Sequence, residues 1–304
     1  MIKNIYRKIT PISIRKFVAE FRFKRLRRKI IVYLSALGKR GSAESAEIAA
    51  FLEKHERVED IIFPYEFTQK YDWNDIEIFR NKDGFPYCIR SGRRLYGKKS
   101  MSDEMFAKYY NSLLIEQDEK SPHRYLFPHR MPKSGSTIAD IGAAEGIFTL
   151  DVIGTVGKAY LFECDDGWID ALKLTFTEEI AAGKVEIVRA FVGDYDDSRQ
   201  NIISLDTFFA DKSLDYVKAD IEGAEEKMLS GGRRVFENNV GACLLACYHR
   251  QNAENHFRNY FSEVDFAHIE VNARKMVWWH QYDVLGKNLK KPYLRNGVIF
   301  AEKL

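Results

Sequence analysis

Cysteine is scarce in this chain, and its spacing fits no metal or redox motif. The 304 residues include four cysteines, and none of them belongs to a C-x-x-C pair. Two of them, Cys243 and Cys247, lie in the apolar run "ACLLACY", which is typical of a buried strand. The sequence therefore predicts neither a disulfide framework nor a zinc site, and it favours a reducing compartment.

Long apolar runs are also missing. A transmembrane helix needs roughly 18 consecutive apolar residues, whereas the longest apolar block of the N-terminal region, "IIVYLSALG", spans only residues 30–38. A signal peptide is a poor interpretation as well, because a long basic segment precedes this block and no compact small-residue cleavage site follows it. We expect a cytoplasmic protein, with peripheral contact at the inner membrane surface as an open alternative.

Acidic residues are nearly absent from the first 40 residues. This segment carries 13 Lys and Arg residues against a single acid, so its net charge is +12 and that of the rest is −9. Its apolar residues recur at helical spacing, at Ile14, Phe17, Val18 and Phe21 and, less regularly, at Leu26 and Ile30. The pattern predicts a basic amphipathic helix that docks on its own domain or a partner subunit, or lies on an anionic membrane. Nucleic acid is disfavoured, since the acidic remainder would repel phosphates.

The chain is rich enough in apolar residues, at 45%, to bury one large core or a core with a smaller domain. We divide it into a basic helical arm (1–45), a small α+β region (46–130) and a C-terminal domain (131–304). In the small region, turns at Asp83-Gly84 and Ser91-Gly92 predict an antiparallel meander. A helix over about 102–114, with Ser102 as its N-cap, follows it.

After residue 137 the pattern alternates between strands and helices, and no internal repeat or low-complexity tract appears. Such alternation predicts an α/β fold with a mostly parallel sheet covered on both faces. A C-terminal hairpin with a long insert is expected to complete the sheet. The predicted strands are residues 137–141, 158–163, 184–188, 214–219, 242–248, 268–273 and 297–302.

The first of these strands runs into a glycine turn, Asp140-x-Gly142-x-x-x-Gly146. Ligands of parallel sheets bind where the strands end, so we expect the N–H groups of this turn to face the binding crevice. The second strand ends in Glu163, 17 residues beyond Gly146. An acid there can accept both hydrogen bonds of a ribose 2′,3′-diol, which points to an adenosine-containing ligand.

Two cofactors satisfy this pattern, a nicotinamide dinucleotide and S-adenosylmethionine. The dinucleotide fingerprint G-x-G-x-x-G lets the backbone approach a pyrophosphate, but here Asp140 replaces its first glycine and Glu145 lies in the turn. Two carboxylates would repel a pyrophosphate, whereas they suit a sulfonium and an ammonium group. The sign of the charge therefore favours S-adenosylmethionine.

A second polar cluster, "DYVKADIEGAEEKMLSGG", follows the predicted strand over 214–219. Alternation along an extended backbone would place Lys218, Asp220 and Glu222 on one side of it. His249, at the end of the next strand, and Asp220 are both candidate general bases. A divalent metal held by Asp220 and Glu222 is a less favoured alternative.

These motifs resemble a known family. The segments "ADIGAAEGIFTL", "LFECDD", "ISLDTFF" and "VKADIEGAEEKMLSGG" are similar to successive motifs of the FkbM family of S-adenosylmethionine-dependent methyltransferases, over about 40% of the chain. Two departures are Ser204 in place of a usual threonine and Cys247-Tyr248-His249 in place of Glu-x-His. The resemblance implies a class I methyltransferase fold with a seven-stranded sheet, and O-methylation of a saccharide, glycan or related metabolite.

The predicted site follows from these motifs and the resemblance. The candidate catalytic residues are Asp220, His249, Lys218 and Glu222. The candidate cofactor contacts are Asp140, Gly142, Ala143, Ala144, Glu145, Gly146, Glu163, Cys164, Phe191 and Asp220. The candidate acceptor contacts are His123, Arg124, Trp278 and Trp279. A nicotinamide-dependent oxidoreductase and a binding module without turnover remain as alternatives, and the oligomeric state is left open.

Overall fold

The computed structural model describes residues 12–38, 41–57, 59–278 and 291–304. It forms two compact units, one of Met1–Lys70 with Arg274–Arg295 and one of Tyr71–Ala273 with Asn296–Leu304. Residues 71–130, which the predicted division separates from the C-terminal domain, thus belong to the same unit as the sheet, and the three-part division stays a prediction. No helix in the described ranges has the length and hydropathy needed to span a membrane.

In the first unit, α2 (Ile12–Leu37) packs against α3 (Ala43–Lys54), and Ser42 caps α3 by accepting from the N–H of Ser45. The buried side chains of α2 are Phe23, Ile30 and Leu34, which lie on one helical face. Two 3₁₀ turns, η2 (Glu59–Ile61) and η3 (Glu66–Lys70), follow, and β12 (Lys275–Val277) pairs with β13 (Leu294–Asn296).

The predicted helix is confirmed, but its apolar face differs from the prediction. The sequence predicts Phe21 on the apolar face, yet 61% of it is exposed. The buried stripe contains Ile30, with Leu26 half-buried beside it. The helix buries residues spaced by seven and four, because this spacing keeps one face against α3. The side chains of Ile14, Phe17 and Val18 lie outside the described residues.

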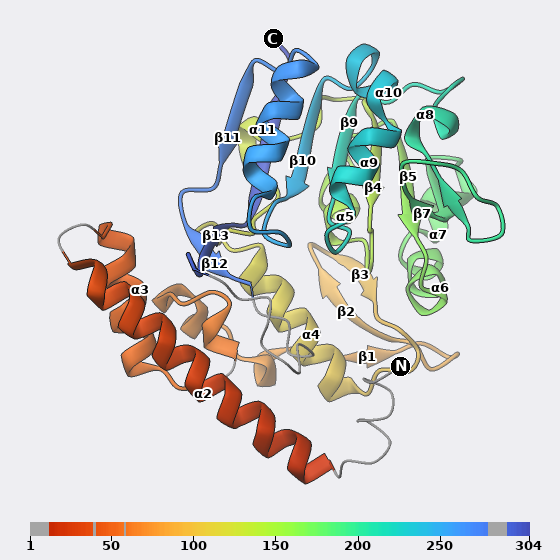
Figure 1. Cartoon of the computed structure of the whole chain (residues 1–304). Coiled ribbons are helices and arrows are strands. Elements are labelled where there is room, and N and C mark those ends of the chain that lie inside the picture. The colour runs from red at the N-terminus through yellow and green to blue at the C-terminus, as the bar shows by residue number, and fades with distance from the viewer. Residues whose placement is uncertain (1–11, 39–40, 58, 279–290) are drawn as a thin grey trace. The chain divides into compact units, whose positions relative to one another are not determined.

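The second unit is built on a seven-stranded sheet in the order β11-β14-β10-β9-β4-β5-β6 (Figure 1). The five strands from β10 to β6 in this order run parallel, and β14 is antiparallel to both β10 and β11. This confirms the predicted α/β fold with its closing hairpin. The strands are β4 (Thr137–Ile141), β5 (Lys158–Glu163), β6 (Val185–Arg189), β9 (Tyr216–Ala219), β10 (Ala242–Ala246), β11 (His268–Val271) and β14 (Val298–Glu302).

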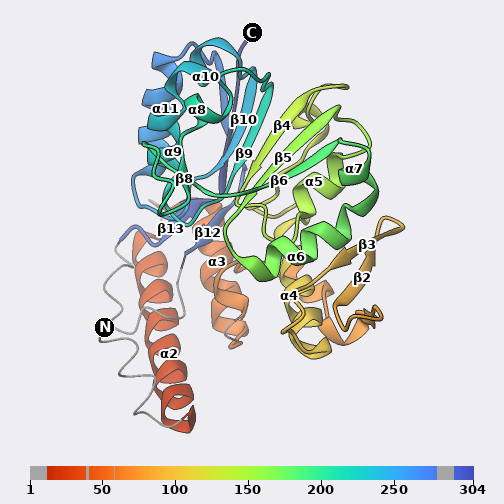
Figure 2. The same cartoon turned by 90° about the vertical axis from the view of Figure 1, so that its right-hand side faces the viewer.

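Helices cover both faces of this sheet (Figures 1 and 2). Apolar side chains of α8 to α11 pack on one face, and those of α4, α5 and α6 pack on the other. The helices are α4 (Asp103–Glu116), α5 (Ile147–Val152), α6 (Asp166–Thr175), α7 (Thr177–Ala181), α8 (Leu205–Phe208), α9 (Glu225–Gly231), α10 (Arg233–Asn238) and α11 (Ala253–Glu263). The short strands β7 (Phe191–Val192) and β8 (Ile202–Ile203) pair beside the sheet.

The predicted meander is confirmed and forms part of the second unit. Strands β1 (Phe79–Arg80), β2 (Pro86–Arg90) and β3 (Arg93–Tyr96) are antiparallel, and α4 begins after its N-cap Ser102. Gly97 allows α4 to approach, because a Cβ at this position would lie 2.4 Å from the ring of Phe106. The 3₁₀ turns η4 (Trp73–Asp75) and η5 (Pro128–Arg130) flank this region.

Candidate active site

The loop between β4 and α5 lies close to the carboxyl end of β9. Gly142 has a φ of +72°, and a Cβ there would lie 2.2 Å from the backbone oxygen of Asp220, so only glycine fits. The N–H groups of Gly142 and Ala143 donate to the carbonyl of Phe162. The expectation that these two groups face the binding crevice is therefore wrong, because they extend the hydrogen bonding of the sheet instead.

A buried ion pair ties the first predicted motif to the second. Asp140 and Lys218 are opposite each other in the parallel pairing of β4 and β9, and their side chains approach to 2.9 Å. The second carboxylate oxygen of Asp140 accepts from the hydroxyl of Thr149 at 2.8 Å, and Lys218 also donates to the carbonyl of Gly142 at 2.9 Å. Burial alone would lower the pKa of Lys218, but Asp140 raises it above its usual value. The protein therefore neutralises Asp140 itself.

Two other carboxylates of the cofactor region have no such partner. Glu145 and Glu163 are 3% and 9% exposed, and within the described ranges neither forms an ion pair. Glu145 accepts from the hydroxyl of Tyr109 on α4, and burial raises its pKa above the usual value. Buried charges without counter-ions are costly. The preference for a cationic ligand thus rests on Glu145 and Glu163, and these residues fit S-adenosylmethionine.

Glu163 is held mainly by backbone donors. Its Oε1 accepts from the N–H groups of Cys164 and Asp165 at 2.7 and 2.8 Å, and its Oε2 accepts from that of Ala144 at 2.9 Å. A carboxylate offers about four acceptor positions, so capacity for one further donor remains rather than the two expected for a ribose diol. Phe191, on β7, is 55% exposed and free to stack on a planar group.

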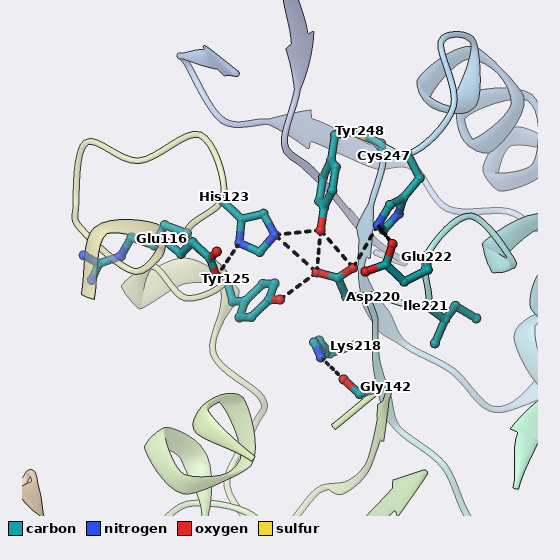
Figure 3. Close-up of polar contacts among 12 residues, drawn as sticks. Glu116, His123, Tyr125, Gly142, Lys218, Asp220, Ile221, Glu222, Cys247 and Tyr248 are labelled. Atoms are coloured by element: carbon teal, nitrogen blue, oxygen red, sulfur yellow. Dashed lines mark hydrogen bonds and ion pairs between the residues drawn. The ribbon is translucent and has the colours of Figure 1, made fainter. Parts of the chain in front are cut away.

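The carboxylate of Asp220 is the centre of the second cluster (Figure 3). It accepts from the hydroxyl of Tyr125 at 2.9 Å and from that of Tyr248 at 3.1 Å, and the Nε2 of His123 lies 3.2 Å away. Burial alone would raise the pKa of Asp220, but His123, His249 and Lys218 together lower it below its usual value. Burial and the charge of Asp220 raise the pKa of both tyrosines, so both stay hydrogen-bond donors.

His249 lies on the other side of Asp220 and is oriented by a buried acid. Its Nδ1 is 3.0 Å from Oε1 of Glu225, and its Nε2 is 3.5 Å from Asp220 and 3.8 Å from Glu222. Burial would lower the pKa of His249, but Glu225, Asp220 and Glu222 raise it above 6.5. Glu222 does not continue the strand as predicted: its φ of +56° places it in a turn, and 73% of its side chain is exposed.

His123 is placed in the same way as His249, between Asp220 and a second carboxylate. Its Nδ1 is 3.9 Å from Glu116 at the end of α4, and its Nε2 faces Asp220 and the hydroxyl of Tyr248. Burial raises the pKa of Glu116 to about 7, although the nearby His123 opposes the shift. Glu116, His123, Asp220, His249 and Glu225 thus form a continuous line of acids and imidazoles across the strand ends.

The segment that carries His123 is fixed by the residue that follows β11 and the residue that precedes β14. The side-chain amide of Asn272 donates to the carbonyls of Ser121, Pro122 and Arg124 at 3.3, 2.8 and 3.1 Å. Gly297 lies against the same segment, and a Cβ there would lie 2.2 Å from the oxygen of Pro122.

This close contact yields a prediction. Gly297→Ala forces residues 121–124 to move, so His123 leaves its position beside Asp220 and the rate of methyl transfer falls about 10-fold to 100-fold, as expected for a misplacement near 1 Å. Steady-state kinetics on the folded variant measures this. Gly154→Ala is the matched control, because a Cβ at Gly154 meets nothing within 4 Å. An unchanged rate in Gly297→Ala would contradict the inference that residues 121–124 position His123 for the reaction.

The remaining predicted residues lie elsewhere. Arg124 donates to the carbonyls of Leu126 and Gln117, so its guanidinium supports the backbone of its own segment. Trp278 belongs to the first compact unit, and Trp279 lies outside the described residues. Both acceptor assignments to tryptophan remain predictions.

In the structure, the residues that could hold a divalent metal differ from the predicted pair of Asp220 and Glu222. Within the described ranges, Asp220, Glu225 and His249 have ligand atoms within 4.8 Å of one another, and Glu222 is not part of this group. Oε1 of Glu225 already accepts from the N–H of Ile221 at 3.0 Å and of Gly223 at 3.4 Å, and it faces His249. Contacts within the protein account for this geometry, so we propose no metal.

Sequence reasoning missed several members of the site. Glu225 is the last acid of the K-x-D-x-E-G-A-E run, so the motif itself pointed to it. Tyr125 is two residues from His123, and Tyr248 directly precedes His249. Their positions next to candidate site residues could therefore have indicated that both tyrosines belong to the site. Glu116 and Tyr109 lie on α4, and no local pattern connects that helix with the strand ends.

The strand order and the residues at the strand ends define a class I methyltransferase domain, as the resemblance implied. Residues 136–276 match the family model described as "Methyltransferase FkbM domain". Over these residues, which are slightly less than half of the chain, the protein is similar to the methyltransferase FkbM family. The match also favours a methyltransferase over the dinucleotide alternative. A search of curated proteins found no match.

Solved structures provide distant likenesses. The methyltransferase FkbM from Methylobacillus flagellatus KT is 16% identical with a TM-score of 0.44, over 66% of this chain and 53% of that one, so this chain spans about half its length. The precorrin-6y C5,15-methyltransferase from Geobacter metallireducens GS-15 is 14% identical with a TM-score of 0.38, over 57% and 84%. An S-adenosylmethionine-dependent O-methyltransferase from Thermotoga maritima is 19% identical with a TM-score of 0.34, over 57% and 60%.

Proposed function

We propose that this protein methylates a hydroxyl group of a neutral saccharide, glycan or related metabolite. The observation that carries the proposal is the line of acids and imidazoles centred on Asp220, at the strand ends beside the cofactor loop (Figure 3). Methyl transfer to oxygen needs a group that takes the hydroxyl proton, and an imidazole oriented by a buried carboxylate is suited to this task. The imidazole of His249 and the buried carboxylate of Glu225 lie together on one side of Asp220.

In this mechanism His249 is the general base. Glu225 fixes the ring through Nδ1, which leaves Nε2 facing Asp220 and the exposed Glu222. The acceptor hydroxyl donates its proton to Nε2, and the resulting imidazolium is stabilised by Asp220 and Glu225. When bound, S-adenosylmethionine supplies an electrophilic methyl group. Glu145, Glu163 and Phe191 are the groups that would hold it, and alignment contributes up to roughly 7–11 kcal/mol.

The charge of the site indicates the class of acceptor. Its carboxylates outnumber its basic side chains, which supports a neutral hydroxyl compound and opposes a phosphate or a carboxylate at the reacting centre. The carboxylates are Glu116, Asp140, Glu145, Glu163, Asp220, Glu222 and Glu225, and the basic side chains are His123, Lys218 and His249. Carboxylates also accept well from the hydroxyls of a sugar.

The test has two stages. Isothermal titration with S-adenosylhomocysteine should show binding, and Glu163→Gln should weaken it, because a buried carboxylate facing the ligand loses its charge. A panel of neutral and phosphorylated saccharides, incubated with radiolabelled S-adenosylmethionine, should then yield labelled product from the neutral members. Binding without transfer to any acceptor would favour the module without turnover. Transfer to phosphorylated sugars alone would contradict the proposed acceptor class.

The raised pKa of His249 predicts a pH dependence. Only the neutral ring can accept a proton, so kcat/KM should rise with pH through a value above 6.5. Glu225→Gln removes one of the carboxylates that raise this pKa, so the rising limb should move to lower pH. The pH profile of kcat/KM measures the shift, and Glu226→Gln, one residue along and paired with Arg250 and His256, should leave it in place. If the rising limb of the pH profile stayed in place in Glu225→Gln, His249 would not be the group that titrates.

A further inference from the structure

One face of α2 is basic, and it is exposed within the part of the chain that the structure describes. Among its exposed residues are Lys24, Arg25, Arg28 and Lys29, and none of them forms an ion pair with any residue in the described ranges. Arg27, between them, behaves differently: it turns inward and donates to the carbonyl of Leu52 at 2.6 Å, with Glu56 at 3.4 Å. The contrast shows that one face of α2 packs against α3 and the residues after it, while the opposite face is exposed to solvent.

Two large apolar residues lie within the basic face. Phe21 and Val32 are each 61% exposed, although both could have been buried in a plain amphipathic helix. At about 100° per residue, Phe21, Arg25, Arg28 and Val32 fall on one strip about 60° wide and about 16 Å long. Lys24 and Lys29 flank this strip. Along this exposed strip, the two arginines thus lie between the two apolar residues.

We propose that this face of α2 binds the surface of an anionic lipid bilayer. Basic side chains of such a helix attract anionic head groups, while Phe21 and Val32 enter the boundary between head groups and acyl chains. A second copy of this chain is a poor occupant, because the same face would bring like charges together. Nucleic acid is also disfavoured, since Val32 at one end of the strip has no planar face for a base.

The proposal is independent of methyl transfer, and a binding experiment tests it on the full-length protein. The wild type should sediment with vesicles of phosphatidylglycerol and phosphatidylcholine and remain in solution with vesicles of phosphatidylcholine alone. Arg25→Glu with Arg28→Glu should lower the partition coefficient at least about tenfold, and raised salt should do the same. Phe21→Ser with Val32→Ser should weaken binding at both low and high salt, because this double variant removes the apolar side chains that enter the bilayer.

Two controls keep the result specific to α2. Lys82→Glu with Arg199→Glu makes the same change of charge at exposed residues outside α2 and should bind vesicles like the wild type. Arg25→Gln with Arg28→Gln provides a milder variant, and circular dichroism checks the fold of each. The proposal is overturned if the wild type ignores anionic vesicles or if the Arg25 and Arg28 variants bind as well as the wild type. Binding to an RNA oligonucleotide alone, lost in those variants, would overturn the lipid assignment.

Discussion

His249→Gln is expected to lower kcat for methyl transfer by about 10²–10⁴-fold, the contribution of a positioned general base. Glutamine retains a polar group near Glu225 but cannot take a proton from the acceptor. Binding of S-adenosylhomocysteine should stay close to that of the wild type, because the proposed cofactor residues Glu145 and Glu163 lie in the loop after β4 and at the end of β5. Single-turnover kinetics with saturating cofactor measures the loss.

The matched control is His256→Gln. This exposed histidine of α11 pairs with Glu226 at 2.9 Å, and Glu226 is not a member of the line centred on Asp220, so its replacement should leave kcat unchanged. If His249→Gln retained kcat within a few fold, His249 would not be the base. His123→Gln would then be the next variant to test, because His123 approaches Asp220 from the opposite side with Glu116 behind it.

The strands and the glycine turn after β4 were predictable because their signals are local. Buried parallel strands are short apolar runs, and a strand that ends in an acid and two glycines marks the turn at a binding crevice. The bounds of β4 and β5 agree with the predicted ranges to the residue. Asp220 and His249 could be predicted to lie near each other for a related reason, since neighbouring parallel strands end at the same edge of the sheet.

The environment of these residues could not be predicted in the same way. Whether Asp140 faces a ligand or a lysine depends on the register of β4 against β9, which places Lys218 opposite it. His123 reaches Asp220 because Asn272, about 150 positions along the chain, holds its segment. The buried face of α2 likewise depends on where α3 packs, so periodicity alone placed Phe21 on the wrong side. Each of these facts arises from contacts between distant parts of the sequence.

The pair of Asp140 and Lys218 supports a prediction about stability. Both side chains are nearly inaccessible, at 0% and 4% exposed, and they approach to 2.9 Å. Lys218→Met removes the cation and leaves the Asp140 carboxylate buried, with the Thr149 hydroxyl as its remaining side-chain donor among the residues that the structure describes. Breaking a buried pair in this way costs about 3–5 kcal/mol. Urea denaturation followed by circular dichroism should show this decrease in the free energy of unfolding.

A double variant separates the value of the pair from the cost of an unpaired charge. Asp140→Leu with Lys218→Met replaces both ions by apolar groups, and such replacements are often neutral or stabilising. The double variant should therefore be more stable than Lys218→Met alone, while Lys173→Met, at an exposed lysine, should change stability by less than about 0.5 kcal/mol. A double variant as unstable as the single one would mean that Lys218 acts through Gly142 and the cofactor loop rather than through Asp140. In that case titration with S-adenosylhomocysteine should show weaker binding in both variants.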